Sequence, residues 1–305
     1  MTRRPVTLLV NPISGGKPGS GPPLDEDPSR LTSEALEAAL LQRGLEVETH
    51  VLAEADDPAA LARSAAAAGR DVVVAGGDGT VSLAASALVS EPKAALGILA
   101  MGSFNNMARG FDVPSTLDAA LDAISVGKTT AMDCGWVVRD GEGGRPFFEA
   151  AGVGLDALGF LAVEIAGRRG WRAALRALWR GLRMRRTPMR ITIDDRTYST
   201  GSPAVTVSNG PYHGLGFAIS ADADPTDGVL DVAVFGGMSR VDVLRHFLAV
   251  ARHRPQREPR VSRGRGRRVV IEGRRRALPA HADGETIGMT PVTLEVRPGA
   301  LRIFR

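Results

Sequence analysis

The sequence has little cysteine, few aromatic residues and no long apolar run. Of its 305 residues, one is cysteine and 5% are aromatic. The single Cys134 excludes an internal disulfide and a site made of several thiolates, which fits a reducing compartment such as the cytosol. No apolar run approaches the roughly 20 residues of a membrane-spanning helix, and the short apolar stretch before Asn11 predicts no secretion signal. We therefore expect a cytoplasmic protein, peripheral on the inner face of the membrane if it meets a membrane at all.

Positive charge is small in sum but unevenly spread along the chain. The net charge is +4, yet two runs, 168–190 and 252–276, hold more than half of the 38 Lys and Arg residues. Such runs favour an anionic partner, such as phospholipid headgroups, nucleic acid or nucleotide phosphates. No aromatic platform accompanies them, so we expect no nucleic-acid partner. For the second run, a solvated arginine-rich surface is an equally good interpretation.

Up to about residue 125, short apolar runs alternate with amphipathic segments. We predict strands at 6–10, 45–51, 71–75 and 96–100, and helices at 31–43, 58–68, 81–89 and 115–125. Several of these strands lack polar alternation, as strands covered on both faces do. The pattern indicates a Rossmann-like α/β domain with a largely parallel sheet over residues 1–127.

Beyond residue 128, β-type runs separated by turn signals replace this pattern. We predict strands at 130–139, 147–152, 189–193, 204–208, 229–235, 268–272 and 292–303, interrupted by helices at 157–184 and 240–253. Closely spaced strands with such turns are typical of an antiparallel sandwich. Residues 128–305 therefore form a second, β-rich domain in this interpretation, and the last strands, about 292–305, either complete it or return to the first domain.

The strongest local pattern is a buried strand that ends in glycines and opens directly into a helix. Residues 71–80 read DVVVAGGDGT. Backbone N–H groups and the positive end of the helix then point at one place, which suits a phosphate group. Gly77 and Gly79 permit a tight turn and close approach to a ligand. Asp78 fits beside phosphate when a cation such as magnesium lies between them.

Two further polar loops follow predicted strands. Residues 11–17 read NPISGGK, and residues 101–109 read MGSFNNMAR. Ligands of open α/β sheets bind outside the carboxyl ends of the strands, where these loops meet. One glycine cluster after a strand is usually only a tight turn, but three such loops on one edge favour a phosphate-binding site.

The motifs NPxSGGK, GGDGT and LGILxxGSxNNxAR, in this order, resemble the catalytic domain of the diacylglycerol kinase and sphingosine kinase superfamily, which is distantly related to NAD kinases. The resemblance continues through GVGLDA at 152–157, DPTDGVLD at 224–231 and DGE at 283–285, and it covers essentially the whole chain. It implies an α/β nucleotide domain followed by a β-sandwich domain. It also implies that ATP contacts Asn11, Pro12, Ile13, Ser14 and Gly15 in the first loop, Gly77, Asp78, Gly79, Thr80, Val81, Ser82 and Leu83 in the second, and Ser103 and Asn105 in the third.

The same resemblance implies the catalytic carboxylates and their magnesium. Asp78 and Asp133 would belong to the catalytic magnesium network, in which Asn106 stands where many relatives carry Asp and adds no charge. Phosphoryl transfer needs a group that takes or positions the hydroxyl proton. D-G-E alone is usually only a turn between strands, but the resemblance makes Asp283 and Glu285 the candidates, and our hypothesis favours Asp283.

Bacterial relatives hold a structural magnesium in the loop that matches 224–231. The resemblance carries this ion onto the side chain of Asp227 and onto Asp224 and Val229, chiefly through backbone oxygens. A solvated turn without a metal is the alternative.

Apolar residues and arginines form two stripes at helical spacing between residues 171 and 186. Such a cationic amphipathic helix either packs its apolar stripe into the core or docks on an anionic membrane. For the second alternative, the residues expected at the membrane are Trp171, Arg172, Arg176, Trp179 and Arg180.

Taken together, the resemblance implies a two-domain, ATP-dependent lipid kinase that phosphorylates diacylglycerol to phosphatidic acid, with Mg²⁺ as cofactor. Its expected partners are ATP and a lipid in an anionic membrane, and a homodimer is an open alternative. Other acceptors are sphingoid bases or another lipid alcohol. The rival interpretations are an NAD kinase and a non-catalytic nucleotide-binding protein that associates with membranes.

Overall fold

The computed structural model describes residues 3–14, 31–89, 91–138, 143–155, 157, 187–214, 216, 218–239, 241–242, 245 and 258–305. The two helices predicted at 157–184 and 240–253 lie almost entirely outside these residues. The chain divides into two compact units, of which unit 1 comprises residues 1–133 and 298–305 and unit 2 residues 134–297. This division falls slightly later than the predicted one after residue 127. That each unit is an independent domain stays a prediction.

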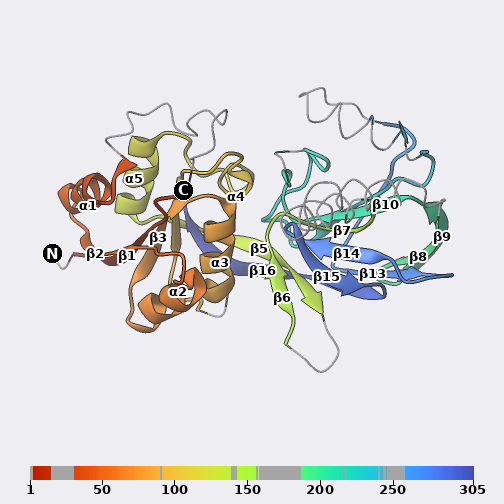
Figure 1. Cartoon of the computed structure of the whole chain (residues 1–305), viewed down its shortest axis with the longest axis horizontal. Helices are drawn as coiled ribbons and strands as arrows, with labels where there is room; N and C mark the ends of the chain where they lie inside the picture. The colour runs from red at the N-terminus through yellow and green to blue at the C-terminus, as the bar shows by residue number, and fades with distance from the viewer. Residues whose placement is uncertain are drawn as a thin grey trace. The chain divides into compact units, whose positions relative to one another are not determined.

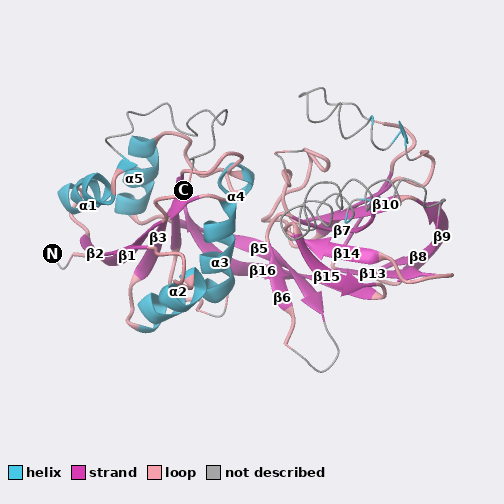
Figure 2. Cartoon of the chain, in the orientation of Figure 1, coloured by secondary structure: helices cyan, strands magenta, loops and turns pink. Residues whose placement is uncertain are grey.

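Unit 1 alternates strands and helices, coloured separately in Figure 2. Its elements are β1 (Pro5–Val10), α1 (Ser33–Gln42), β2 (Glu46–Val51), α2 (Pro58–Ala67), β3 (Asp71–Gly76), α3 (Asp78–Leu88), β4 (Leu96–Ala100), α4 (Asn106–Gly110) and α5 (Leu117–Val126). Two strands, β5 (Thr129–Val138) and β16 (Val292–Phe304), continue from one unit into the other.

The strands of unit 1 form a parallel sheet in the order β2-β1-β3-β4, with the end of β16 parallel to β4. Helices α1 and α5 lie on one side of this sheet, and α2 and α3 lie on the other (Figure 1). Both faces of β1 and β3 are therefore covered, which explains why their sequences lack polar alternation. Every residue from Val6 to Val10 is buried.

The ends of these helices follow from local chemistry. Thr32 accepts a hydrogen bond from the Ala35 N–H at the start of α1, and Asp57 does the same for Ala59 before Pro58 opens α2. Such caps satisfy backbone donors that have no partner within the helix. Gly127 ends α5 in the left-handed conformation with φ 77°, which glycine adopts without strain.

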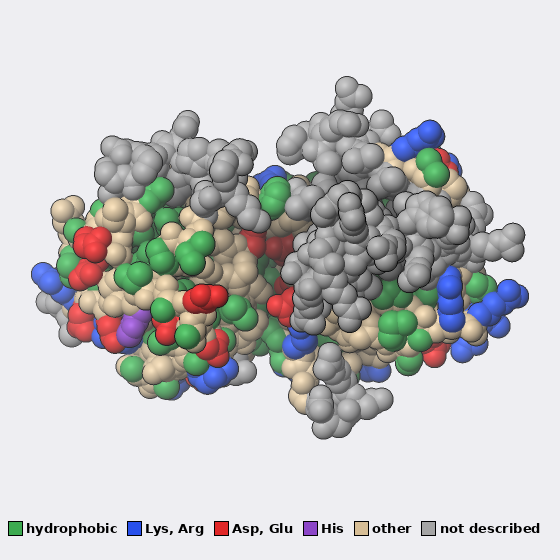
Figure 3. Space-filling model, in the orientation of Figure 1, with side chains coloured by type: hydrophobic (Ala, Val, Ile, Leu, Met, Phe, Trp, Pro, Cys, Tyr) green, Lys and Arg blue, Asp and Glu red, His purple; other side chains and the backbone are tan. Residues whose placement is uncertain are grey.

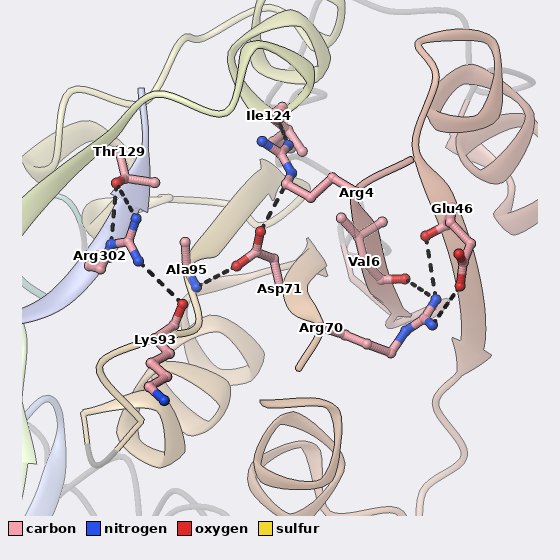
Figure 4. A network of polar contacts seen from close by, with 10 residues as sticks. All are labelled: Arg4, Val6, Glu46, Arg70, Asp71, Lys93, Ala95, Ile124, Thr129 and Arg302. Carbon is pink, nitrogen blue, oxygen red and sulfur yellow. Dashed lines mark hydrogen bonds and ion pairs between the residues drawn. The ribbon is translucent and has the colours of Figure 1, made fainter. Parts of the chain in front are cut away.

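A polar network joins the elements at the amino end of β3 and β4 (Figure 4). Asp71 accepts a 2.8 Å hydrogen bond from the Ala95 N–H and pairs with Arg4 at 3.5 Å. Arg70 donates to the Val6 carbonyl at 3.0 Å and pairs with Glu46 at 2.9 Å. These contacts hold the sheet together at the amino ends of its strands, opposite to the ends that the glycine-containing loops follow.

The described residues of unit 2 lie mainly in strands. They are β6 (Arg145–Phe147), β7 (Ala150–Gly154), β8 (Thr187–Ile193), β9 (Arg196–Ser202), β10 (Ala204–Ser208), β11 (Leu230–Val234), β12 (Ser262–Gly266), β13 (Arg268–Gly273), β14 (Pro279–Ala282) and β15 (Glu285–Met289). One sheet runs β12-β11-β10-β7-β14-β15, and β16, β13, β8 and β9 pair in the other. One apolar core takes residues from both sheets, for example Val205 and Ile271. Unit 2 is thus the predicted antiparallel sandwich.

The predicted strand 147–152 is wrong in its extent. β6 ends at Phe147 and β7 begins at Ala150, because the N–H groups of Phe148 and Glu149 donate to the Asp283 carboxylate and not to a neighbouring strand. Four strands, β9, β12, β14 and β15, are absent from the prediction. They are short or polar and lack the runs of β-branched residues on which it relied.

The second arginine run begins outside the described residues and then forms β12 and β13. β12 is an edge strand, and charged side chains on an edge oppose pairing with another chain. Several of its arginines are paired, as Arg260 is with Glu258 at 2.7 Å and Arg268 with Glu295 at 2.6 Å. Basic side chains gather at the right-hand margin of unit 2 in Figure 3. Among the described residues, no helix combines the length and apolar character needed to cross a membrane.

Candidate functional site

Three loops meet at the carboxyl edge of the parallel sheet in unit 1. We call them the loop cluster, defined as residues 11–14 after β1, 77–80 after β3 and 101–105 after β4. The strand register aligns Val10 with Ala75 and Gly76 with Ala100, so the three strands end side by side. Two backbone hydrogen bonds of 2.9 Å continue this alignment into the loops, from Asn11 to Ala75 and from Met101 to Gly76.

Side chains connect the first loop to the second. The Asn11 amide donates to the Thr80 hydroxyl at 2.8 Å, and the Ser14 hydroxyl accepts from the Gly77 N–H at 3.2 Å. Thr80 is buried, whereas Asn11 and Ser14 are partly exposed. The hydroxyls expected to face phosphate therefore also hold the two loops together.

The second and third loops touch through their glycines. A Cβ on Gly102 would lie 2.6 Å from the Gly77 Cα and 2.9 Å from Oδ1 of Asn105, closer than real contacts allow. Asn105 has a left-handed backbone with φ 50°, which Asn tolerates better than most residues. Its amide accepts from the Gly102 N–H at 2.8 Å and donates to the Gly102 carbonyl at 2.9 Å. Asn105 thus shapes the third loop directly.

Helix α3 starts within the cluster, at Asp78. Gly77 is its N-cap and makes no side-chain cap, so the first N–H groups of this 11-residue helix are offered at the cluster. A helix amino terminus of this kind attracts anions. Three further residues predicted to contact ATP lie in the first two turns of α3: Val81, Ser82 and Leu83. Of these, Val81 is buried and Leu83 is 45% exposed. Val81 can therefore serve a ligand only through its backbone.

The Asp78 carboxylate faces the start of α4 and accepts a 3.2 Å hydrogen bond from the Met107 N–H. Burial raises the pKa of Asp78, and the backbone N–H groups of Asn105–Met107 oppose this rise, as does Arg109. A partly desolvated carboxylate is stabilised by a nearby cation, so Asp78 fits a magnesium ligand. Asn106, the first residue of α4, is buried.

Other predicted residues of unit 1 occupy varied surroundings. Pro12, Ile13 and Ser103 are exposed, and Gly79 has open space where a Cβ would stand. Gly15 lies outside the described residues.

Asp133 is buried on β5, where Oδ1 accepts a 2.7 Å hydrogen bond from the Gly299 N–H. Within the described part of the chain, no three His, Cys, Asp or Glu side chains form a group that could hold a metal.

Asp283 lies in unit 2, in the turn between β14 and β15, with φ 46°. Its carboxylate accepts three backbone hydrogen bonds, from Phe148 at 2.7 Å, Glu149 at 2.9 Å and Ala150 at 3.1 Å. Burial raises the pKa of Asp283 to about 6, although these donors and Arg145 act in the opposite direction. The carboxylate therefore fixes the segment between β6 and β7.

Glu285 has different surroundings from Asp283. It is exposed at the start of β15, and its Oε2 accepts from the Arg145 guanidinium at 2.8 Å. Arg145 also reaches the Ala282 carbonyl at 3.4 Å. No pattern in the sequence points to this arginine, because it stands 140 residues away on β6.

The predicted structural metal site lies in the turn before β11, where three side-chain oxygens of Asp224 and Asp227 already have partners. Oδ1 of Asp224 accepts from the N–H and hydroxyl of Thr226 at 2.9 and 2.6 Å. Asp227 accepts from the Val229 N–H at 3.1 Å and forms an ion pair with Arg265. An arginine therefore pairs with the Asp227 side chain that the prediction assigns to the ion, so the side chains present do not fit that ion. The contribution of the Asp224 and Val229 backbone oxygens stays a prediction.

The residues predicted to contact a membrane, Trp171, Arg172, Arg176, Trp179 and Arg180, lie outside the described residues. Their placement stays a prediction.

Comparison with known families divides the chain in two. Residues 5–137 match the diacylglycerol kinase catalytic domain, and residues 163–305 match the YegS C-terminal NAD kinase beta sandwich-like domain. A diacylglycerol kinase of Mycobacterium tuberculosis is 29% identical over 98% of this chain and 94% of its own length. A probable lipid kinase, YegS-like, of Pseudomonas savastanoi is 28% identical over 86% of this chain and 85% of its own.

A solved structure has the same fold. A diacylglycerol kinase from Bacillus anthracis superposes with a TM-score of 0.71 at 20% identity, covering all of this chain and 97% of that one. The order of an α/β domain and a β-sandwich domain, predicted from the sequence, is confirmed.

Proposed function

Since the chain joins a diacylglycerol kinase catalytic domain to a YegS C-terminal domain, it belongs to the diacylglycerol kinase and YegS-like lipid kinase family, and we propose that it transfers the γ-phosphate of ATP to the hydroxyl of diacylglycerol. The product is phosphatidic acid. The loop cluster carries this proposal: three loops that are bonded to one another present glycine backbone and a helix amino terminus at one sheet edge.

In this proposal the loop cluster holds the phosphates of ATP. The N–H groups at the start of α3 donate to phosphate oxygens, and the absence of a Cβ at Gly79 lets the backbone approach them. Thr80 and Ser14 order the loops and offer hydroxyls. Catalysis of phosphoryl transfer depends mostly on such positioning and on charge stabilisation.

Magnesium, held by Asp78 together with Asp133, would neutralise negative charge on the phosphates. The burial of Asp78 supports its role as a magnesium ligand, because a neighbouring cation stabilises a desolvated carboxylate. Asn106 adds no charge at this place. The magnesium ligands of this chain are thus fewer than in relatives that carry Asp there.

Glu285, in our proposal, takes the proton of the acceptor hydroxyl. The hydroxyl oxygen forms a bond to the γ-phosphorus, the bond from that phosphorus to the β-γ bridging oxygen breaks, and ADP leaves with the electron pair. The sequence favoured Asp283 for this role, but both oxygens of Asp283 accept backbone hydrogen bonds. Glu285 is exposed and is oriented by Arg145, so it is the carboxylate that a substrate hydroxyl can approach.

The deciding experiment is transfer of labelled γ-phosphate from ATP, with and without magnesium, into a panel of lipids in mixed micelles. Diacylglycerol, monoacylglycerol, sphingosine and ceramide form the panel, and NAD is the parallel acceptor. Labelled phosphatidic acid supports the proposal, and another labelled lipid would change the acceptor. Label in NAD would favour an NAD kinase, and ATP binding without transfer would favour a non-catalytic protein.

A peripheral position on an anionic membrane belongs to the same proposal. It rests on the apolar and arginine stripes between residues 171 and 186, since each basic residue near an anionic leaflet contributes roughly 1 kcal/mol. Sedimentation with anionic liposomes tests it: binding that survives the change of Arg172, Arg176 and Arg180 to Glu would remove the hypothesis. A homodimer stays a prediction that light scattering can check.

A further inference from the structure

The inference concerns the turn before β11 and its neighbour on the edge strand β12. β11 and β12 pair antiparallel, and their register sets Arg265 directly opposite Asp231 and Arg263 opposite Ala233. Side chains of directly opposed residues lie on the same face of a sheet and interact. Nε of Arg265 approaches Oδ1 of Asp231 to 3.3 Å.

The same guanidinium reaches a second carboxylate. Nη2 of Arg265 donates to Oδ2 of Asp227, so one cation bridges two acids that are four residues apart in the sequence. The Asp227 side chain is 25% exposed and the Asp231 side chain 18% exposed. The two carboxylates are therefore screened less than charges on an open surface, whereas the Arg265 side chain is 51% exposed.

Two carboxylates this close to one cation need its charge. Arg265 is placed between them, because Nε lies 3.3 Å from Oδ1 of Asp231 and Nη2 donates to Oδ2 of Asp227. Without a positive charge between them, the two acids would repel each other.

A divalent ion is the usual alternative source of that charge. Calcium takes six to eight oxygens and magnesium six. In this turn, however, Asp224 uses Oδ1 for Thr226 and Asp227 uses Oδ1 for the Val229 N–H, so those oxygens close the turn itself. The guanidinium then holds the remaining oxygen of Asp227.

We propose that Arg265 serves as a built-in cation between Asp227 and Asp231, and that this turn is therefore independent of divalent metal. The guanidinium ties the turn to β12 in the way a structural ion would tie it to the sheet. Because the arginine is part of the chain, chelation cannot remove it. This inference concerns the stability of unit 2 and does not depend on the lipid substrate.

The test is the thermal unfolding temperature of the full chain without ATP, measured in EDTA and in magnesium. The natural protein is expected to keep the same Tm in both. Arg265→Ala leaves the two carboxylates without their cation, so its Tm should fall in EDTA, by roughly 2–4 °C for each kcal/mol lost, and partly recover in magnesium. Arg268→Ala removes an exposed guanidinium whose partner is Glu295, so it is the matched control and should show no dependence on metal.

Two results would overturn the proposal. One is an Arg265→Ala protein whose Tm is the same in EDTA and in magnesium, because the two acids would then need no cation. The other is a natural protein whose Tm falls in EDTA by an amount that Asp227→Asn abolishes, which would place a metal ion in the turn. If the Tm of the natural protein and that of Asp227→Asn fall equally in EDTA, the metal that EDTA removes lies outside this turn, and the proposal is supported. If Arg265→Ala does not fold, Arg265→Lys replaces it, since Lys keeps the charge but not the two-pronged contact, and the EDTA comparison of the natural protein still decides.

Discussion

The side-chain amide of Asn11 donates a 2.8 Å hydrogen bond to the Thr80 hydroxyl, across 69 residues of sequence. This bond joins the loop after β1 to the first turn of α3. The loop cluster is thus a bonded unit before any nucleotide arrives. Preorganised donors of this kind reduce the ordering cost of binding.

The first prediction tests this bond. Thr80→Val keeps the shape of the buried side chain but leaves the Asn11 amide without its acceptor, at a cost of about 1 kcal/mol. If the bond orders the phosphate-binding loops, KM for ATP rises about fivefold. Thr80→Ser keeps the hydroxyl and is the control, for which steady-state kinetics should give a KM near that of the natural protein. Equal KM values for the two variants would contradict the role given to the bond.

The second prediction concerns the contact of Gly77 with Gly102. Gly102→Ala places a Cβ 2.6 Å from the Gly77 Cα, so the two loops must separate. Overpacking of this kind costs about 1–3 kcal/mol, and both the unfolding temperature and the affinity for ATP should fall. Calorimetry measures each of them.

Gly79→Ala is the matched control for Gly102→Ala. Its Cβ meets no atom within 4 Å, so the unfolding temperature should not change. A weaker affinity for ATP in this variant would then report that the nucleotide approaches the backbone at Gly79. Unchanged affinity would place the phosphates elsewhere in the cluster.

Much of unit 1 could be predicted from the sequence, because its signals are local. Apolar runs without alternation gave the parallel strands, and the glycines after β3 gave the turn that opens α3. The contacts of unit 2 were not predictable in this way. Arg145 meets Glu285 across 140 residues of sequence, from a strand that does not pair with β15. Arg265 meets Asp231 because β11 and β12 pair in a particular register. That register depends on the packing of the whole sandwich.

The DGE motif shows the same limit on a smaller scale. Its turn was expected from the sequence, and the structure has it between β14 and β15. The different surroundings of its two acids were not predictable, because the donors to Asp283 come from the Phe148–Ala150 backbone on another part of the chain. Only the fold distinguishes a carboxylate that organises a loop from one that is exposed.

The third prediction is a pH dependence that comes from Asp283. Its pKa is about 6 in the folded chain against 3.8 for the ordinary carboxyl, so between these values the folded state holds a proton that the unfolded state has lost. The free energy of unfolding therefore decreases as pH rises from about 4 to about 6, by at most about 1.4 kcal/mol per pH unit. Above pH 6 this contribution stays constant.

Asp283→Asn isolates this contribution, since Asn tolerates the left-handed backbone and does not titrate. Urea unfolding at pH 4.5, 5.5 and 7 gives the difference in free energy between the natural protein and the variant. That difference should shrink as pH rises. A difference that grows with pH would show instead that the three N–H donors keep the carboxylate ionised throughout.

The fourth prediction separates the roles of the two carboxylates. Glu285→Gln removes the proposed proton acceptor from an exposed position, where an ion pair contributes only about 0–1 kcal/mol. We expect kcat to fall by about 10²–10⁴, with KM for ATP and the unfolding temperature nearly unchanged. Asp283→Asn should instead lower mainly the unfolding temperature, because it weakens three backbone hydrogen bonds.

Kinetics and thermal unfolding of both variants, measured on the same preparations, decide between the two assignments. If Glu285→Gln keeps normal turnover while a folded Asp283→Asn loses it, the proton acceptor is Asp283. Arg145→Lys adds a further check on Glu285, because lysine keeps the positive charge but not the planar donor pair. If Arg145 orients Glu285, this variant lowers kcat less than Glu285→Gln does and leaves KM for ATP unchanged, whereas a purely structural arginine would affect only the unfolding temperature.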